Sequence, residues 1–128
     1  MHIPDEQNRL SSPAHFYIFT TFLSILCLVA VSYLWPHPEI LSICLIANAG
    51  LIIYLGRARR DTLLFILSAL WGAIAEMVAI AFGAWSYTIP FTFGIPYWLP
   101  LVWGTAGVFL VRLYDALGFY LVEKGNDD

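Results

Sequence analysis

The sequence is poor in charged residues, since Asp, Glu, Lys and Arg make up only 12% of its 128 residues. Soluble domains carry about 25% charged residues, so this composition excludes an ordinary water-facing surface. The net charge of −3 comes mostly from the two tails, and no basic stripe of the kind that binds nucleic acid is present. The length suits one membrane domain and leaves no room for a second domain.

Motifs for cofactor and metal chemistry are also missing. The sequence contains no Walker loop, nucleophile elbow, HExxH or GxGxxG pattern, so we predict no cofactor. Cys27 and Cys44 both fall inside apolar runs and have no CxxC spacing. His37 and Glu39 could form half of a metal site, but two ligands in one loop are weak evidence. We therefore predict no metal.

The chain does have four long apolar runs, at residues 16–35, 39–56, 62–82 and 98–118. About 20 apolar residues at 1.5 Å each cross the hydrocarbon of a bilayer, so each run predicts a transmembrane helix. The prolines of the PHPE segment separate the first two runs, because proline cannot continue a hydrogen-bonded helix. The predicted fold is all-α: a polytopic four-helix bundle that forms a single integral membrane domain.

Basic residues predict the orientation of the bundle. The connection between the second and third runs contains Arg57, Arg59 and Arg60, whereas the other two connections contain no Lys or Arg. The positive-inside rule places this basic segment in the cytoplasm, and both termini are then cytoplasmic. Arg112 and Asp115 in the fourth run are interpreted as charges that snorkel to the cytoplasmic interface, at a spacing that permits a pair on the helix surface.

Glu76 is the only ionisable residue in the run 62–82. A charged group at membrane depth costs roughly 2.5–3.5 kcal/mol on insertion scales, so it indicates a functional site by default. At 1.5 Å per residue, Glu76 lies about 21 Å from the cytoplasmic end of its helix, which is in the outer half of the bilayer.

Small residues recur at helical spacing on the side of the third helix that carries Glu76, and such residues let helices approach closely. This pattern turns Glu76 toward protein rather than lipid. A carboxyl in that position can act as a general acid or exchange a proton for a cation. We predict Glu76 as the catalytic or proton-carrying residue. The alternative is a protonated carboxyl that only holds helices together.

The stretch from Gly83 to Pro100, which includes the predicted outer loop 83–97, is dense in aromatic, proline and glycine residues. Tryptophan and tyrosine often form a belt at the membrane interface, but a belt does not explain the prolines and glycines. These fix sharp turns, so the loop could also fold over a cavity at Glu76. Periodicity does not separate these alternatives. The predicted ligand-binding residues are Asn48, Trp85, Tyr87, Trp98 and Trp103.

Eight positions in this part of the chain form a pattern: Glu76, Gly83, Trp85, Tyr87, Gly94, Pro96, Pro100 and Trp103. The pattern resembles that of carotenoid hydratases of the bisanhydrobacterioruberin type, which are multi-pass membrane enzymes that add water to an isoprenoid end group. The resemblance implies an isoprenoid-like ligand. The same stretch is similar to uncharacterised small bacterial multi-pass membrane proteins, and we expect a bacterial inner (plasma) membrane location.

A second resemblance is to small multidrug exporters, which have four helices, a similar length and one membrane glutamate. The segment GAIAE is similar to their start, although their glutamate lies in the first helix. Three functions stay open: binding or converting an apolar, isoprenoid-like ligand in an outer-half cavity around Glu76; proton-coupled export of small lipophilic cations; or a structural or assembly role in a larger membrane complex. Expected partners are membrane lipids and an apolar small molecule, with a homodimer or larger complex as further options and no nucleic acid.

Overall fold

The computed structural model describes residues 14–56 and 59–126 of the chain. Four helices account for most of this length: α2 (Ala14–Leu34), α3 (Pro38–Gly56), α4 (Arg59–Ala81) and α5 (Leu99–Asn126). Each helix is long and apolar enough to cross a membrane. The predicted all-α fold with four membrane-spanning helices is therefore confirmed.

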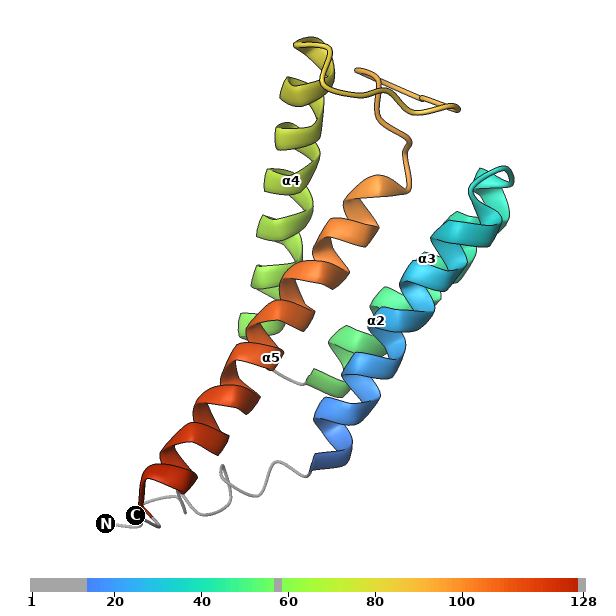
Figure 1. Cartoon of the computed structure of the whole chain (residues 1–128). Helices are drawn as coiled ribbons and strands as arrows, with labels where there is room; N and C mark the ends of the chain where they lie inside the picture. Colours follow the sequence, from blue (N-terminus) through green and yellow to red (C-terminus); the bar gives the residue numbers. More distant parts are fainter. Residues whose placement is uncertain (1–13, 57–58, 127–128) are drawn as a thin grey trace.

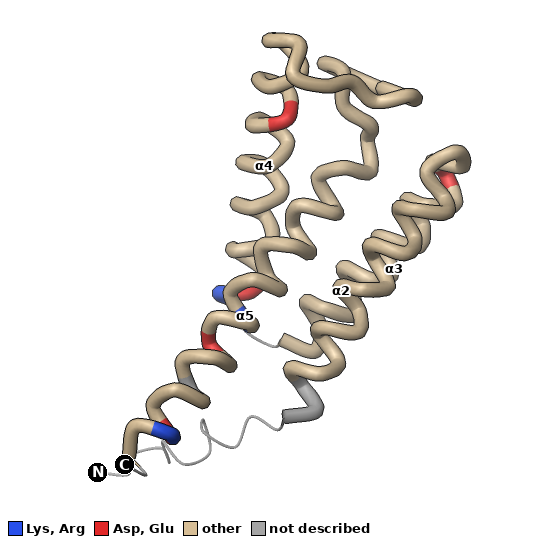
Figure 2. Tube along the Cα trace, viewed as in Figure 1, with Lys and Arg blue, Asp and Glu red and all other residues tan. Residues whose placement is uncertain are grey.

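The helices form two antiparallel hairpins, α2 with α3 and α4 with α5, and α5 contacts all three other helices (Figure 1). We call the end where α2 begins and α5 finishes the terminal end, and the end that carries the segment between α4 and α5 the loop end. The Lys and Arg residues of the described chain gather toward the terminal end (Figure 2). Positive charge is thus distributed unevenly along the bundle.

Two helix boundaries differ from the predicted ones. Arg59 and Arg60 begin α4 instead of lying in the preceding loop, and Arg57 lies outside the described residues. Helix α5 continues about two turns beyond the predicted end at residue 118. The predicted end at Gly118 is too early because Leu, Glu and Lys in the segment that follows favour helix, and α5 continues through this single glycine.

Helices α4 and α5 pack closely through glycine positions. A side-chain carbon at any of three glycines would overlap a residue of the facing helix: Gly72 against Trp103, Gly104 against Phe65, and Gly107 against Ser68. Small residues at a helix interface allow this approach of two backbones. The small-residue face of α4 is therefore used at Ser68 and Gly72, whereas Ala75 is exposed.

A buried ion pair joins all four helices near the terminal end. Arg112 on α5 donates to Asp61 Oδ2 on α4 at 2.8 Å and to Thr20 Oγ1 on α2 at 2.8 Å. It also donates to the backbone oxygen of Ile52 on α3 at 2.9 Å. The side chains of Arg112 and Asp61 are only 4% and 5% exposed, so this pair lies within the packed bundle.

The interpretation of Arg112 as a snorkelling charge that could pair with Asp115 on its own helix is therefore wrong. Arg112 turns inward because α4 supplies an opposite charge inside the bundle, where a lone guanidinium would be costly. Asp115 is instead bonded to Arg60 of α4, with an N–O distance of 2.9 Å.

Candidate functional site

The end of α4 is shaped so that the chain reverses direction immediately. Gly83 N–H donates to Ile80 O at 2.9 Å and Ala84 N–H donates to Ala79 O at 3.0 Å. These two bonds form a Schellman motif, which requires a left-handed residue after the helix. Gly83 supplies it with φ of 78°. The following residues are consequently directed back toward the helix instead of away from it.

A tight hairpin turn follows within the 82–98 loop. Thr92 and Ile95 exchange two backbone hydrogen bonds of 3.2 and 3.0 Å. The two residues between them, Phe93 and Gly94, both have positive φ (48° and 81°), as in a type I′ turn. A side-chain carbon at Gly94 would lie 2.7 Å from Ile80 Cγ2, so the turn lies directly on α4.

The loop is anchored by buried residues and also presents exposed aromatic ones. Ile95 and Trp98 are 3% and 6% exposed and pack in the core at the loop end of the bundle. In contrast, Phe91 and Phe93 are mostly exposed. The segment therefore combines the two features weighed from its sequence: sharp turns that fold it back onto the helices, and outward aromatic residues of the kind found in an interfacial belt.

Glu76 receives two hydrogen bonds from this loop. Trp85 Nε1 donates to Glu76 Oε2 at 2.8 Å, and the Tyr87 hydroxyl donates to the same oxygen at 3.2 Å. Glu76 lies five residues before the end of α4, which is about 8 Å along the helix axis. The reversal at Gly83 is what brings residues 85 and 87 back down to this level.

The electrostatic surroundings of Glu76 differ from those of an ordinary ion pair. No Lys, Arg or His within residues 14–56 and 59–126 makes an ion pair with it. Both donors converge on Oε2, and no donor to Oε1 is found in the described part of the chain. The carboxyl is thus held in place by neutral groups, and one oxygen is left for another partner.

Tyr87 is affected by this arrangement. Burial raises the pKa of Tyr87 to about 12, and the negative charge of Glu76 and the hydrogen bond to it act in the same direction. The phenol therefore stays protonated at any physiological pH and acts as a neutral hydrogen-bond donor.

Tyr87 also lines a cavity of about 480 Å³ between the loop and the end of α2. Its ring contacts Trp98 edge-on, with ring centroids 6.3 Å apart. The cavity falls in the ~300–1,000 Å³ range of small-molecule sites. Its lining is mixed, with apolar side chains and four hydroxyl-bearing residues: Val31, Ser32, Trp35, Ser86, Tyr87, Thr88, Ile89, Pro96 and Trp98.

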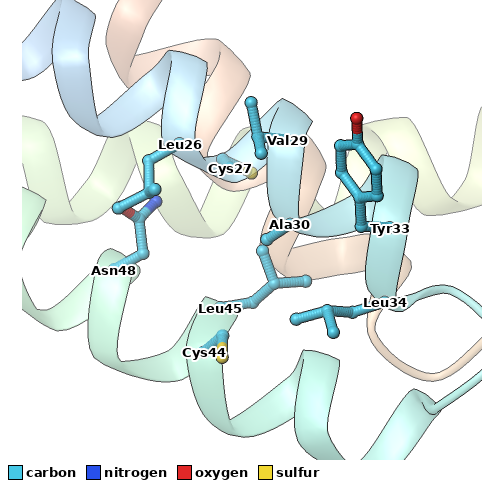
Figure 3. Close-up of a pocket in the computed structure, with 9 residues that line it drawn as sticks. All are labelled: Leu26, Cys27, Val29, Ala30, Tyr33, Leu34, Cys44, Leu45 and Asn48. Carbon is cyan, nitrogen blue, oxygen red and sulfur yellow. The ribbon is translucent and has the colours of Figure 1, made fainter.

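The structure brings four of the six predicted site residues together, namely Glu76, Trp85, Tyr87 and Trp98. Trp103 instead packs against Gly72, where it fills the slot left by the missing side chain. Asn48 lies in a different pocket, between α2 and α3 (Figure 3). It is separated from Glu76 because α3 packs chiefly on α2 and α5, and meets α4 least.

The contribution of α2 to this cavity was not predicted from the sequence. Ser32 and Trp35 lie at the end of that helix, and no motif or spacing connects them with the loop more than fifty residues later. An aromatic residue at a helix end fits an interfacial position equally well. Only the tertiary arrangement distinguishes the two roles.

Among the residues that the structure describes, no group of three or more His, Cys, Asp or Glu side chains lies close enough to hold a metal ion. No protein-family model, curated protein or solved structure matches this chain. The resemblances to carotenoid hydratases and to small exporters therefore stay predictions that the comparisons do not support.

Proposed function

We propose that this membrane protein binds an apolar or amphipathic small molecule, isoprenoid-like in character, in the cavity beneath the 82–98 loop. Glu76 is the proton-carrying group of this site. The observation that carries the proposal is the double role of Tyr87, which donates to Glu76 at 3.2 Å and also lines the cavity. A change at the carboxyl is thereby transmitted to the cavity wall.

The lining of the cavity supports a ligand with an apolar body and one neutral polar end. Val31, Trp35 and Trp98 supply apolar surface, and Ser32, Thr88 and their neighbours supply hydroxyls. No charged side chain from the described ranges, 14–56 and 59–126, lines it. Pockets of this kind orient a mostly apolar ligand through a few hydrogen bonds. Conversion of the ligand, where it occurs, would draw its proton from the Glu76 carboxyl by way of the Tyr87 hydroxyl, which contacts the carboxyl and lines the cavity.

Charge distribution supports an orientation of the bundle in the membrane. Lys and Arg of the described chain gather at the terminal end (Figure 2), and such residues favour the cytoplasmic side. Both termini are then cytoplasmic, and the cavity opens at the outer side of a bacterial inner membrane. Reporter fusions at residue 128 and within the 82–98 loop test this orientation, which requires opposite sides for the two positions.

Energy transfer to an isoprenoid alcohol tests the binding proposal. All-trans-retinol is titrated into the detergent-solubilised protein, and quenching of tryptophan fluorescence is followed. Saturable quenching is expected, and Trp35→Phe should remove much of it because Trp35 lines the cavity. Trp71→Phe is the matched control, since Trp71 is 75% exposed on α4. Equal losses from the two variants, or no saturation, would contradict the proposal.

Proton-coupled export of lipophilic cations is a second candidate, favoured by one observation. Glu76 makes no ion pair with a basic side chain in the described chain, so its charge is not committed to a fixed partner and could alternate between a proton and a cation. Purified protein in liposomes would then move a lipophilic cation when a proton gradient is applied. Absence of flux together with tight lipid retention favours the binding function.

A role as a structural or assembly subunit receives less support. The small residues that could serve contact with a partner helix, such as Gly72 and Gly104, are covered by Trp103 and Phe65 of the same chain. A stoichiometric partner that co-purifies after mild solubilisation would be the decisive observation for this role.

A further inference from the structure

We infer that the chain carries a second, separate binding site between α2 and α3, which takes a hydrocarbon chain bearing a hydroxyl group. The site is the pocket in Figure 3, with a volume of about 440 Å³. Its single strongly polar lining residue is Asn48. Glu76 does not line this pocket and lies on a different helix, α4, so the second site is independent of it.

Asn48 is an exception to the rule that buried polar groups are hydrogen-bonded. It is only 6% exposed, yet neither Nδ2 nor Oδ1 has a hydrogen-bond partner among the described residues. Leaving a buried donor or acceptor unpaired is unfavourable, because the group has lost its water without gaining a partner. An amide in this state requires a partner other than the described residues, and the pocket in front of it offers room for one.

The position of Asn48 makes bulk water an unsuitable partner. It lies ten residues from the start of α3 and eight from its end, so it is about 15 Å and 12 Å from the two ends of the helix. This is close to the middle of the hydrocarbon, where water is scarce. In Figure 3 the Asn48 amide projects from α3 toward α2, and the Leu26 side chain projects from α2 toward the amide.

The rest of the pocket is suited to a hydrocarbon chain. On α2 the lining residues recur at helical spacing on one face, and α3 contributes two further residues beside Asn48: Leu26, Cys27, Val29, Ala30, Tyr33, Leu34, Cys44 and Leu45. The cavity at the loop end is lined by Val31, Ser32 and Trp35, which lie on the opposite face of α2. The two sites are therefore separated by the helix itself.

The chemistry of the amide selects the polar group of the ligand. Nδ2 donates and Oδ1 accepts, so a hydroxyl, which does both, can satisfy the two atoms together. A charged headgroup is disfavoured because none of the described Lys, Arg, His, Asp or Glu residues lines the pocket, and an unpaired charge at this depth is costly. The occupant is thus a neutral long-chain or isoprenoid alcohol.

Photolabelling of the protein in nanodiscs tests this inference. Two probes are compared, a diazirine-bearing hexadecanol and the matched diazirine alkane without the hydroxyl, and labelled peptides are identified by mass spectrometry. In the wild type, the alcohol should label the segments 26–34 and 44–48 roughly fivefold more than the alkane, which corresponds to about 1 kcal/mol for the hydrogen bonds. In Asn48→Leu this excess should disappear while alkane labelling persists.

Two further variants make the outcome specific. Ser42 lies on the same helix as Asn48, but its hydroxyl donates to the backbone oxygen of Pro38 in that helix at 2.7 Å. The excess labelling by the alcohol should therefore persist in Ser42→Ala. Glu76→Gln should also keep the excess, which separates this site from the cavity at the loop end. Equal labelling by both probes in the wild type, or an excess that survives in Asn48→Leu, would overturn the inference.

Discussion

Asp61 and Glu76 lie on the same helix and are held in opposite ways. Asp61, near the terminal end, is 4% exposed and bonded at 2.8 Å to the guanidinium of Arg112. Glu76, near the loop end, is only partly buried and is bonded by the neutral donors Trp85 and Tyr87. One carboxyl has a permanent opposite charge beside it, and the other has none in the described chain.

The difference indicates different roles for the two ends of the bundle. Asp61 is bonded to the guanidinium of Arg112, which also bonds α2 and α3, so this pair holds the helices together. A carboxyl held only by neutral donors can gain or lose a proton without breaking an ion pair. The terminal end is thus suited to structure, and the loop end to the proton-dependent function that we propose.

Replacement of Arg112 should have the largest effect on stability. Arg112→Leu leaves Asp61 as a buried charge without its counter-ion, and removal of one partner of such a pair costs about 3–5 kcal/mol. The loss is measured by thermal unfolding in mild detergent. Arg60→Gln is the control, because it leaves the Arg112–Asp61 bond intact and removes the exposed Arg60–Asp115 pair and a longer contact of 3.8 Å between Arg60 and Asp61. Ion pairs of an exposed side chain are worth about 0–1 kcal/mol. Equal losses would show that the buried network is not the structural anchor.

Replacement of Gly94 should come next, because it attacks the fold of the loop. Gly94→Val places a branched side chain at a φ of 81° and against Ile80, at a cost of about 1–3 kcal/mol. Limited proteolysis within the loop should accelerate. Gly50→Ala is the matched control, since nothing lies within 4 Å of a side-chain carbon at that helical position. A loop that stays resistant in Gly94→Val would mean that its contact with α4 is unimportant.

The effect of Tyr87→Phe should be smaller and should depend on pH. The variant loses one hydrogen bond to Glu76, worth about 0.5–1.5 kcal/mol. The Tyr87 phenol is protonated in both folded and unfolded chains below its ordinary pKa of 10.0, and in the folded chain it stays protonated up to a pKa of about 12. Its contribution is therefore complete below pH 10.0 and is lost as the pH rises toward about 12.

An ultraviolet difference titration of wild type against Tyr87→Phe isolates this phenol from the other tyrosines. The difference signal should titrate near a pKa of 12. A midpoint at the ordinary value would contradict the contact with Glu76.

Glu76→Gln should have the smallest effect on stability. The Gln side chain keeps an oxygen that accepts hydrogen bonds from Trp85 and Tyr87. The free energy of unfolding should therefore change by less than about 1 kcal/mol. Thermal unfolding alongside Arg112→Leu gives the direct contrast between the two ends. A large loss in Glu76→Gln would assign Glu76 a structural role like that of Asp61.

The four helices and the reversal in the loop could be predicted because their signals are local. Apolar runs of sufficient length and the glycines and prolines that follow Ala81 determine these features from neighbouring residues alone. The proximity of Trp85 and Tyr87 to Glu76 followed from the same local reversal.

Contacts between distant helices could not be predicted in this way. The Arg112–Asp61 pair depends on how α5 is placed along α4, and no residue pattern determines that placement. The neighbour of the α3 face that carries Asn48 could not be predicted either. Helix α3 is apolar on all sides, so its sequence does not indicate which face turns toward which helix. The same uniformity led to the prediction that Asn48 and Glu76 share one site.

The dependence of ligand binding on Glu76 can be measured by mass spectrometry of the small molecules retained through purification. Wild type, Glu76→Gln and Glu39→Gln are compared at equal protein amounts. Glu39 is an exposed carboxyl in the first turn of α3, so its replacement controls for the loss of charge alone. We expect an apolar-bodied molecule that is retained by wild type and Glu39→Gln and depleted in Glu76→Gln, with all three proteins folded. Equal retention in all three would contradict a proton-dependent binding site at Glu76.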